Sequence, residues 1–220
     1  MFRAVSLALS SLSDKRVMLL LVQVMALTMA AFVVLGIALW YGIDWAFAAY
    51  GLADDDGLTA LLSLAVLLFS GWLLFRSLAV AITWVFADDI IDAVEDRHYP
   101  FAAAQGQRPG YAKAARMGLR SVARALGYNA LMLPVYLMLL ITGVGTALAF
   151  LLLNGYLLGR DLEDMLVARH GESQNLGAIR RFVLGLGSVA AMLIPIVQFI
   201  IPVVATATAV HMAHDRTGRI

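Results

Sequence analysis

Four long apolar blocks, separated by shorter polar segments, dominate the 220-residue chain. Each block exceeds the ~20 residues with which a helix crosses the ~30 Å hydrocarbon core of a bilayer. Apolar residues make up 62% of the sequence and charged residues 14%, against roughly 45–50% and 25% in soluble domains. Because a soluble globule cannot hide this much apolar surface, the sequence predicts an all-α integral membrane protein that forms a single domain over 1–220.

Charge and composition exclude several classes of function. The formal net charge is +1 and cysteine is absent, so the chain has no basic field for nucleic acid and no thiol for disulfides, catalysis or metal binding. It also lacks a Walker loop and a G-x-S-x-G elbow. His211 and His214 form an H-x-x-H pattern without the glutamate and spacing of a zinc hydrolase, and we expect them at the membrane interface. We therefore predict no enzyme, cofactor, metal site or nucleic-acid partner.

The first two blocks are predicted to be long transmembrane helices, over 17–41 and 58–87. The connector between them, 42–57, contains four aspartates but no lysine or arginine, whereas the amphipathic lead-in 1–16 has three basic residues. The positive-inside rule therefore places the N-terminus in the cytoplasm and the connector outside. The second apolar pattern continues past Arg76, so this helix should extend into the cytoplasm.

The third and fourth blocks, 128–158 and 182–213, could each form one crossing or two half-depth helices. A single crossing in each would place the connector 159–181 outside, although it contains four arginines. Two re-entrant hairpins keep this connector and the C-terminus cytoplasmic, and helix breakers stand near the middle of each block. We therefore predict two re-entrant helical hairpins, with tips at Gly143, Gly145, Pro195 and Pro202.

The polar stretch 88–127 is predicted to form cytoplasmic amphipathic helices. Asp88, Asp92, Glu95 and Asp96 share one helical face, and basic residues follow after a turn and a loop. Such a stripe can bind a cation, but it is more often a solvated face or a partner for the basic helix that follows.

Two cations stand immediately before the first crossing. Lys15 and Arg16 follow Ser13 at a helix start, where exposed backbone N–H groups and the positive helix end suit an oxyanion. From the residues alone, an ordinary positive-inside anchor of Lys and Arg is the more common explanation.

Three further arginines could line an anion route. Arg76 is the one charge inside an apolar block, and it either reaches the headgroups or faces the anion. Arg116 and Arg120 lead into the third block, where a basic helix facing lipid headgroups is the alternative.

Four motifs, in order along the chain, resemble one family of bacterial membrane proteins. They are FADDIIDAVE at 86–95, RHYP at 97–100, LNGYLLGR at 153–160 and IPIVQFIIPVVATA at 194–207. Together they are similar to the CysZ sulfate-permease family and its etoposide-induced-protein relatives. The resemblance implies a homo-oligomeric sulfate uptake protein of the bacterial inner membrane that supplies cysteine biosynthesis.

The resemblance also implies a location for the sulfate contacts. In that family, a Gly-Leu-Arg-(Arg) segment before the first long helix is associated with sulfate binding, and the aligned residues here are Ser13, Asp14, Lys15 and Arg16. The two cations match, so the resemblance assigns the anion site to Ser13, Lys15 and Arg16.

Two functions remain open at this point. The first is a sulfate channel or permease that is not driven by ATP. The second is a non-transporting membrane scaffold of the same fold that binds a protein or lipid partner, because a fold does not fix its function.

Overall fold

The computed structural model describes residues 2–49, 58–194 and 197–216, and the part that it describes consists of helices joined by turns and short loops. The elements are, in chain order, α1 (Phe2–Ser11), α2 (Lys15–Ala49), α3 (Leu58–His98), α4 (Pro100–Ala103), α5 (Tyr111–Leu131), α6 (Leu133–Leu139), η1 (Leu140–Thr142), α7 (Gly145–His170), η2 (Glu172–Gln174), α8 (Ala178–Ala191), η3 (Val197–Phe199) and α9 (Ile201–Arg216).

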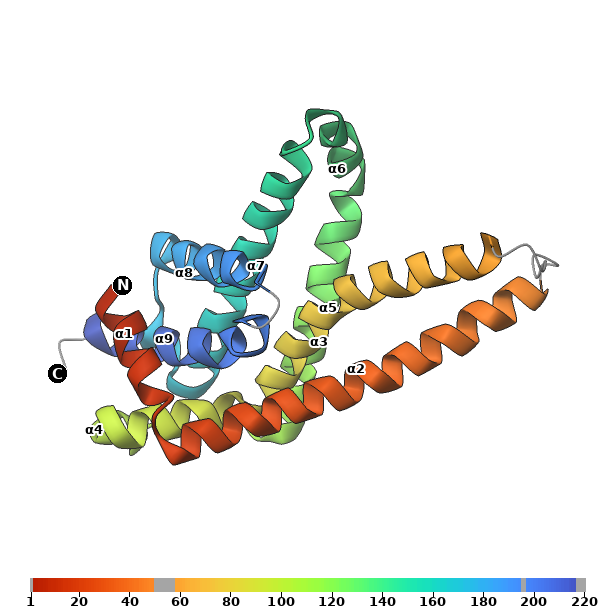
Figure 1. Ribbon diagram of the computed structural model, residues 1–220. Helices are drawn as coiled ribbons and strands as arrows, with labels where there is room; N and C mark the ends of the chain where they lie inside the picture. The colour runs from red at the N-terminus through yellow and green to blue at the C-terminus, as the bar shows by residue number, and fades with distance from the viewer. Residues whose placement is uncertain (1, 50–57, 195–196, 217–220) are drawn as a thin grey trace.

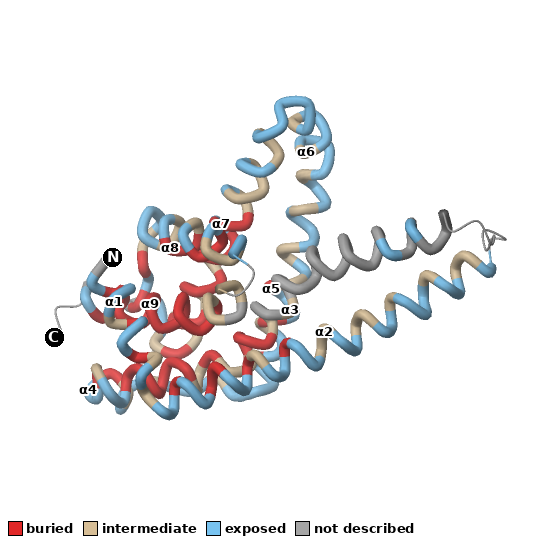
Figure 2. The backbone as a smooth tube through the Cα atoms, in the orientation of Figure 1, coloured by how far each residue is buried: buried red, intermediate tan, exposed pale blue. Residues whose placement is uncertain are grey.

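Two helical arms project from a common body (Figure 1). α2 and α3 pack together in one arm, and α5 with α6 runs against α7 in the other. The body holds α1, α8 and α9 together with the C-terminal parts of α3 and α7. Buried residues gather in the body, whereas the described residues of the arms are mostly exposed or half-buried (Figure 2). The hydrophobic core therefore lies where the arms meet.

The first predicted crossing is part of a longer helix. α2 has 35 residues and ends at Ala49, beyond the predicted 17–41, because no proline interrupts this stretch. The side chains of Val34 and Trp45 are 67% and 73% exposed. Among the described residues, one helix, α2, is long enough and apolar enough to cross a membrane. The bent pair Tyr111–Leu131 and Leu133–Thr142 also meets these two conditions when it is taken as one segment.

The helix of the second block continues without a break through the acidic stretch, so α3 ends at His98 and not near 87. Apolar residues still recur at helical spacing within the acidic stretch. Ile90, Ile91 and Val94 point into the core and are 0% exposed. The helix ends before Pro100, since proline disfavours helical backbone in the preceding residue, and Tyr99 has φ −141° and ψ 57°.

The chain of the third block reverses between η1 and α7. Gly143 has φ 72°, a left-handed conformation that favours glycine. Gly145 is the first residue of α7, and its N–H donates to the Thr142 hydroxyl at 2.8 Å. Between the two limbs, the side-chain amides of Asn129 and Asn154 hydrogen-bond each other at 3.1 and 3.2 Å. These bonds join the two limbs through polar groups on their facing sides.

The fourth block forms α8 and α9, which pack against each other. Pro202 is the second residue of α9, a position where the missing N–H costs no helical hydrogen bond. Pro195 lies outside the described residues. With 14 and 16 residues, α8 and α9 are only ~21 and ~24 Å long. The side chains on α9 from 202 to 214 are buried, so α9 is the central helix of the body.

Candidate functional site

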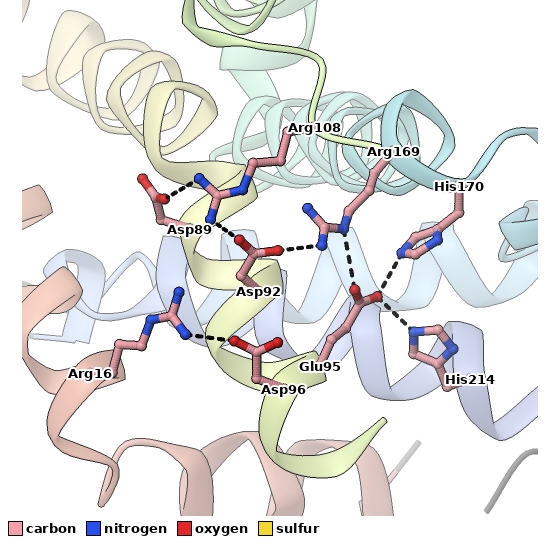
Figure 3. A network of polar contacts seen from close by, with 9 residues as sticks. All are labelled: Arg16, Asp89, Asp92, Glu95, Asp96, Arg108, Arg169, His170 and His214. Atoms are coloured by element: carbon pink, nitrogen blue, oxygen red, sulfur yellow. Dashed lines mark hydrogen bonds and ion pairs between the residues drawn. The ribbon is translucent and has the colours of Figure 1, made fainter. Parts of the chain in front are cut away.

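Three helix ends meet in the body and bring a set of charged side chains together (Figure 3). Glu95 lies near the end of α3, Arg169 and His170 end α7, and His214 lies near the end of α9. α7 stops at this place because Gly171 follows with φ 76° and ψ −176°, a backbone that is essentially restricted to glycine. The cluster is therefore positioned by helix lengths and helix ends.

Glu95 is the centre of the cluster and is 0% exposed. Its Oε1 accepts hydrogen bonds from Nε2 of His170 at 2.7 Å and of His214 at 2.8 Å, and its Oε2 accepts one from Nε of Arg169 at 3.2 Å. Burial raises the pKa of Glu95, but the histidine hydrogen bonds and the charge of Arg169 outweigh burial and lower the pKa to about 2. Glu95 is therefore an anion at neutral pH.

Asp92 connects the same arginine to the loop before α5. Arg169 and Arg108 each donate a hydrogen bond to Asp92, and Arg108 also donates to Asp89 at 3.2 Å. Arg169 is 4% exposed, so carboxylates and not water compensate its charge. The expectation that the acidic stripe pairs with the basic residues after it is confirmed for Arg108, whereas Arg169 comes from 77 positions away.

The predicted anion residues lie at the start of α2, next to the end of α3. The N–H of Arg16 donates to Asp14 Oδ1 at 2.8 Å, and the guanidinium of Arg16 donates to Asp96 at 2.7 Å. Ser13 and Lys15 are exposed. The hydrogen bond from the Arg16 N–H holds the pKa of Asp14 below its ordinary value, against the effect of burial and with help from Arg97. Two carboxylates of the chain itself therefore bind at the positions predicted for the anion: Asp14 at the helix end and Asp96 at the Arg16 side chain.

The other predicted cations lie elsewhere. Arg116 and Arg120 are exposed, one turn apart on α5, away from the face on which Gly118 packs against α3. Arg124 of the same helix pairs with Asp161 and with Asp164 of α7. The side chain of Arg76 lies outside the described residues.

The two histidines of the H-x-x-H pattern, expected at the membrane interface, lie in the protein interior near the end of α9. His211 and His214 are each 1% exposed. His211 Nδ1 is hydrogen-bonded to the Tyr99 hydroxyl at 2.9 Å, and His214 is bonded to Glu95. Both imidazoles are buried because α9 is enclosed by the other helices and brings them against polar partners at the end of α3.

The cluster around Glu95 was not predicted from the sequence, because its members are far apart along the chain. His170 and His214 lie 75 and 119 positions from Glu95. The available signal was indirect: His170 and His214 each follow an apolar block, as the acidic stripe follows the second block.

Comparison with known protein families gives a match over residues 4–206 to the family described as sulfate transporter CysZ/etoposide-induced protein 2.4. The search of curated proteins and the search of solved structures return no match. The family match covers nearly the whole described chain and includes three of the motifs whose resemblance first indicated it, together with all but the last residue of the fourth. The chain therefore belongs to the sulfate transporter CysZ/etoposide-induced protein 2.4 family.

Proposed function

We propose that the protein carries sulfate into the bacterial cell across the inner membrane, as a channel or permease that supplies cysteine biosynthesis without using ATP. The observation that carries this proposal is the family match over residues 4–206. It agrees with the composition of the chain, which has long apolar helices and no nucleotide-binding motif.

The arrangement of exposed side chains supports a membrane position for the arms. Ile141 and Met138, at the tip of the second arm, are 93% and 75% exposed, which is unfavourable in water and suits lipid. In the proposed topology α2 and α3 cross the bilayer, and the hairpins of α5 to α7 and of α8 with α9 enter it from the cytoplasm. The end of the body that holds the charged cluster, where α3, α7 and α9 end, is then cytoplasmic.

The proposed sulfate contacts are Ser13, Lys15 and Arg16, with Arg76, Arg116 and Arg120 along the route. Arg16 faces Asp96 at 2.7 Å at an exposed position, where an ion pair contributes only about 0–1 kcal/mol. A sulfate dianion can therefore replace Asp96 at little cost and gain charge-assisted hydrogen bonds of about 1.5–3 kcal/mol each.

Labelled sulfate flux into proteoliposomes tests this function. We expect flux for the wild-type chain and a loss of about tenfold or more in apparent affinity for Lys15→Gln/Arg16→Gln, since two charged hydrogen bonds are removed. The matched control is Lys113→Gln/Arg180→Gln, which removes the same charge at exposed positions on α5 and α8.

Two results would contradict the proposal in different ways. Equal loss of affinity in both double variants would show that Lys15 and Arg16 act only through net charge. No flux from correctly folded, correctly oriented wild-type protein would favour the membrane scaffold instead.

A further inference from the structure

Three buried side chains from three helices point at one another in the body. Oε1 of Glu95 and one ligating atom each of His170 and His214 lie within 4.8 Å of one another. Both imidazoles meet the same carboxylate oxygen through Nε2 (Figure 3). The side chains of these residues are 0%, 7% and 1% exposed.

The donor set is one that divalent transition metals prefer. Two imidazole nitrogens and one carboxylate oxygen form the protein ligands of many zinc sites, with bonds of ~2.0–2.2 Å. Tetrahedral angles at such bonds separate the ligand atoms by about 3.3 Å, so the present separations of 2.7 and 2.8 Å from Glu95 to the two histidines need to widen by only about half an ångström. Each imidazole would carry its proton on Nδ1, so that the Nε2 lone pair faces the ion.

The surroundings hold the carboxylate in the orientation that a metal requires. Arg169 donates to Oε2 of Glu95, which leaves Oε1 directed at the two imidazoles. Asp92 compensates the charge of Arg169 on its other side, so the negative charge at Oε1 remains for the cation. Outer partners that fix a ligating carboxylate in this way are typical of protein metal sites.

We propose that Glu95, His170 and His214 bind a divalent transition metal ion of the zinc type. The ion links the ends of α3, α7 and α9 and so fastens the two arms to the central helix of the body. Its role is structural, because the side chains of the three ligands are at most 7% exposed, whereas Lys15 and Arg16 are exposed. The metal site does not depend on the proposed transport function.

The test is the zinc content of the purified full chain in detergent, with any affinity tag removed and the protein first stripped with a chelator. After addition of Zn²⁺ and desalting, we expect about one ion per wild-type chain and a higher thermal unfolding midpoint. His170→Gln and His214→Gln should each lose about tenfold or more in zinc affinity, together with the midpoint shift.

The two remaining histidines provide matched controls. His98→Gln and His211→Gln change the same residue type at the same end of the molecule, and both should bind zinc as the wild type does. Equal binding by His170→Gln, His214→Gln and these controls would overturn the proposal, and so would wild-type protein that holds no zinc. If the two ligand variants aggregate, the proposal is tested by adding Co²⁺ to the wild-type protein. The visible absorption spectrum of a four-coordinate site with nitrogen and oxygen ligands supports the proposal, and the absence of that spectrum refutes it.

Discussion

Asp14 has two opposing effects at the start of α2. Its carboxylate caps the helix through the Arg16 N–H at 2.8 Å, yet it also places a negative charge beside the proposed sulfate contacts. Asp14→Asn keeps a capping oxygen and removes the charge. A like charge at ~4 Å costs about 1 kcal/mol or more even in water, so we expect the sulfate concentration for half-maximal flux to fall about fivefold. An increase in that concentration would contradict the proposed site.

The same residue predicts a pH dependence of stability. The folded-state pKa of Asp14 lies below its ordinary 3.8, so the unfolded chain binds the proton more tightly than the folded one. The stabilisation is therefore present above pH 3.8 and is lost as the pH falls through the lowered pKa. Thermal unfolding in detergent should show wild-type protein losing this increment under acid conditions. Asp14→Asn should not show that loss, and a parallel decline in both proteins would assign the acid sensitivity to other groups.

At the level of helices, α7 and α8 can pack closely only because glycines stand at their contact. A Cβ on Gly185 would overlap the backbone of Gly155 and Gly159, whereas a Cβ on Gly187, two positions on, meets nothing within 4 Å. Gly185→Ala should therefore lower the free energy of unfolding by about 1–3 kcal/mol. Gly187→Ala, the control on the same helix, should raise it by up to about 1 kcal/mol through helix propensity. Equal effects in denaturant unfolding would contradict this contact.

At the level of the whole molecule, the distribution of arginines predicts its orientation in the membrane. Four arginines lie between the third and fourth blocks, so residue 173 should face the cytoplasm and residue 42 the outside. Because the chain has no cysteine, Ser173→Cys and Gly42→Cys are each the one thiol in their variant. In intact spheroplasts an impermeant thiol reagent should label Gly42→Cys, and it should reach Ser173→Cys after lysis. Labelling of Ser173→Cys before lysis would contradict the two re-entrant hairpins.

The number of helices predicts how sulfate could pass. In the proposed topology only two helices cross the bilayer, and two helices cannot enclose a water-filled path. We therefore propose that the hairpins complete a pore within a homo-oligomer. Residues 17–41 and 58–87 contain no aspartate or glutamate to carry a proton. Oligomeric protein in proteoliposomes should therefore pass sulfate without ATP and without a pH gradient. Full flux from a preparation shown to be monomeric, or flux that needs an imposed proton gradient, would contradict this mechanism.

The features that the sequence determined by itself are local ones. The apolar blocks predicted the long helices, Pro100 marked the turn after α3, and Gly143 marked the reversal before α7, because each of these depends on residues within a few positions. The bounds were less accurate: α3 continues to His98 because its acidic stretch has buried partners that local pattern does not reveal.

The tertiary structure alone decided which polar groups meet. Glu95 is bonded to residues 75 and 119 positions away, and such pairs depend on how the helices pack around α9. The same packing buries the two histidines of the H-x-x-H pattern and pairs Arg16 with Asp96. The residue pattern shows that a helix end is charged. Burying a charge without a partner is unfavourable, and only the packing of distant helices supplies that partner.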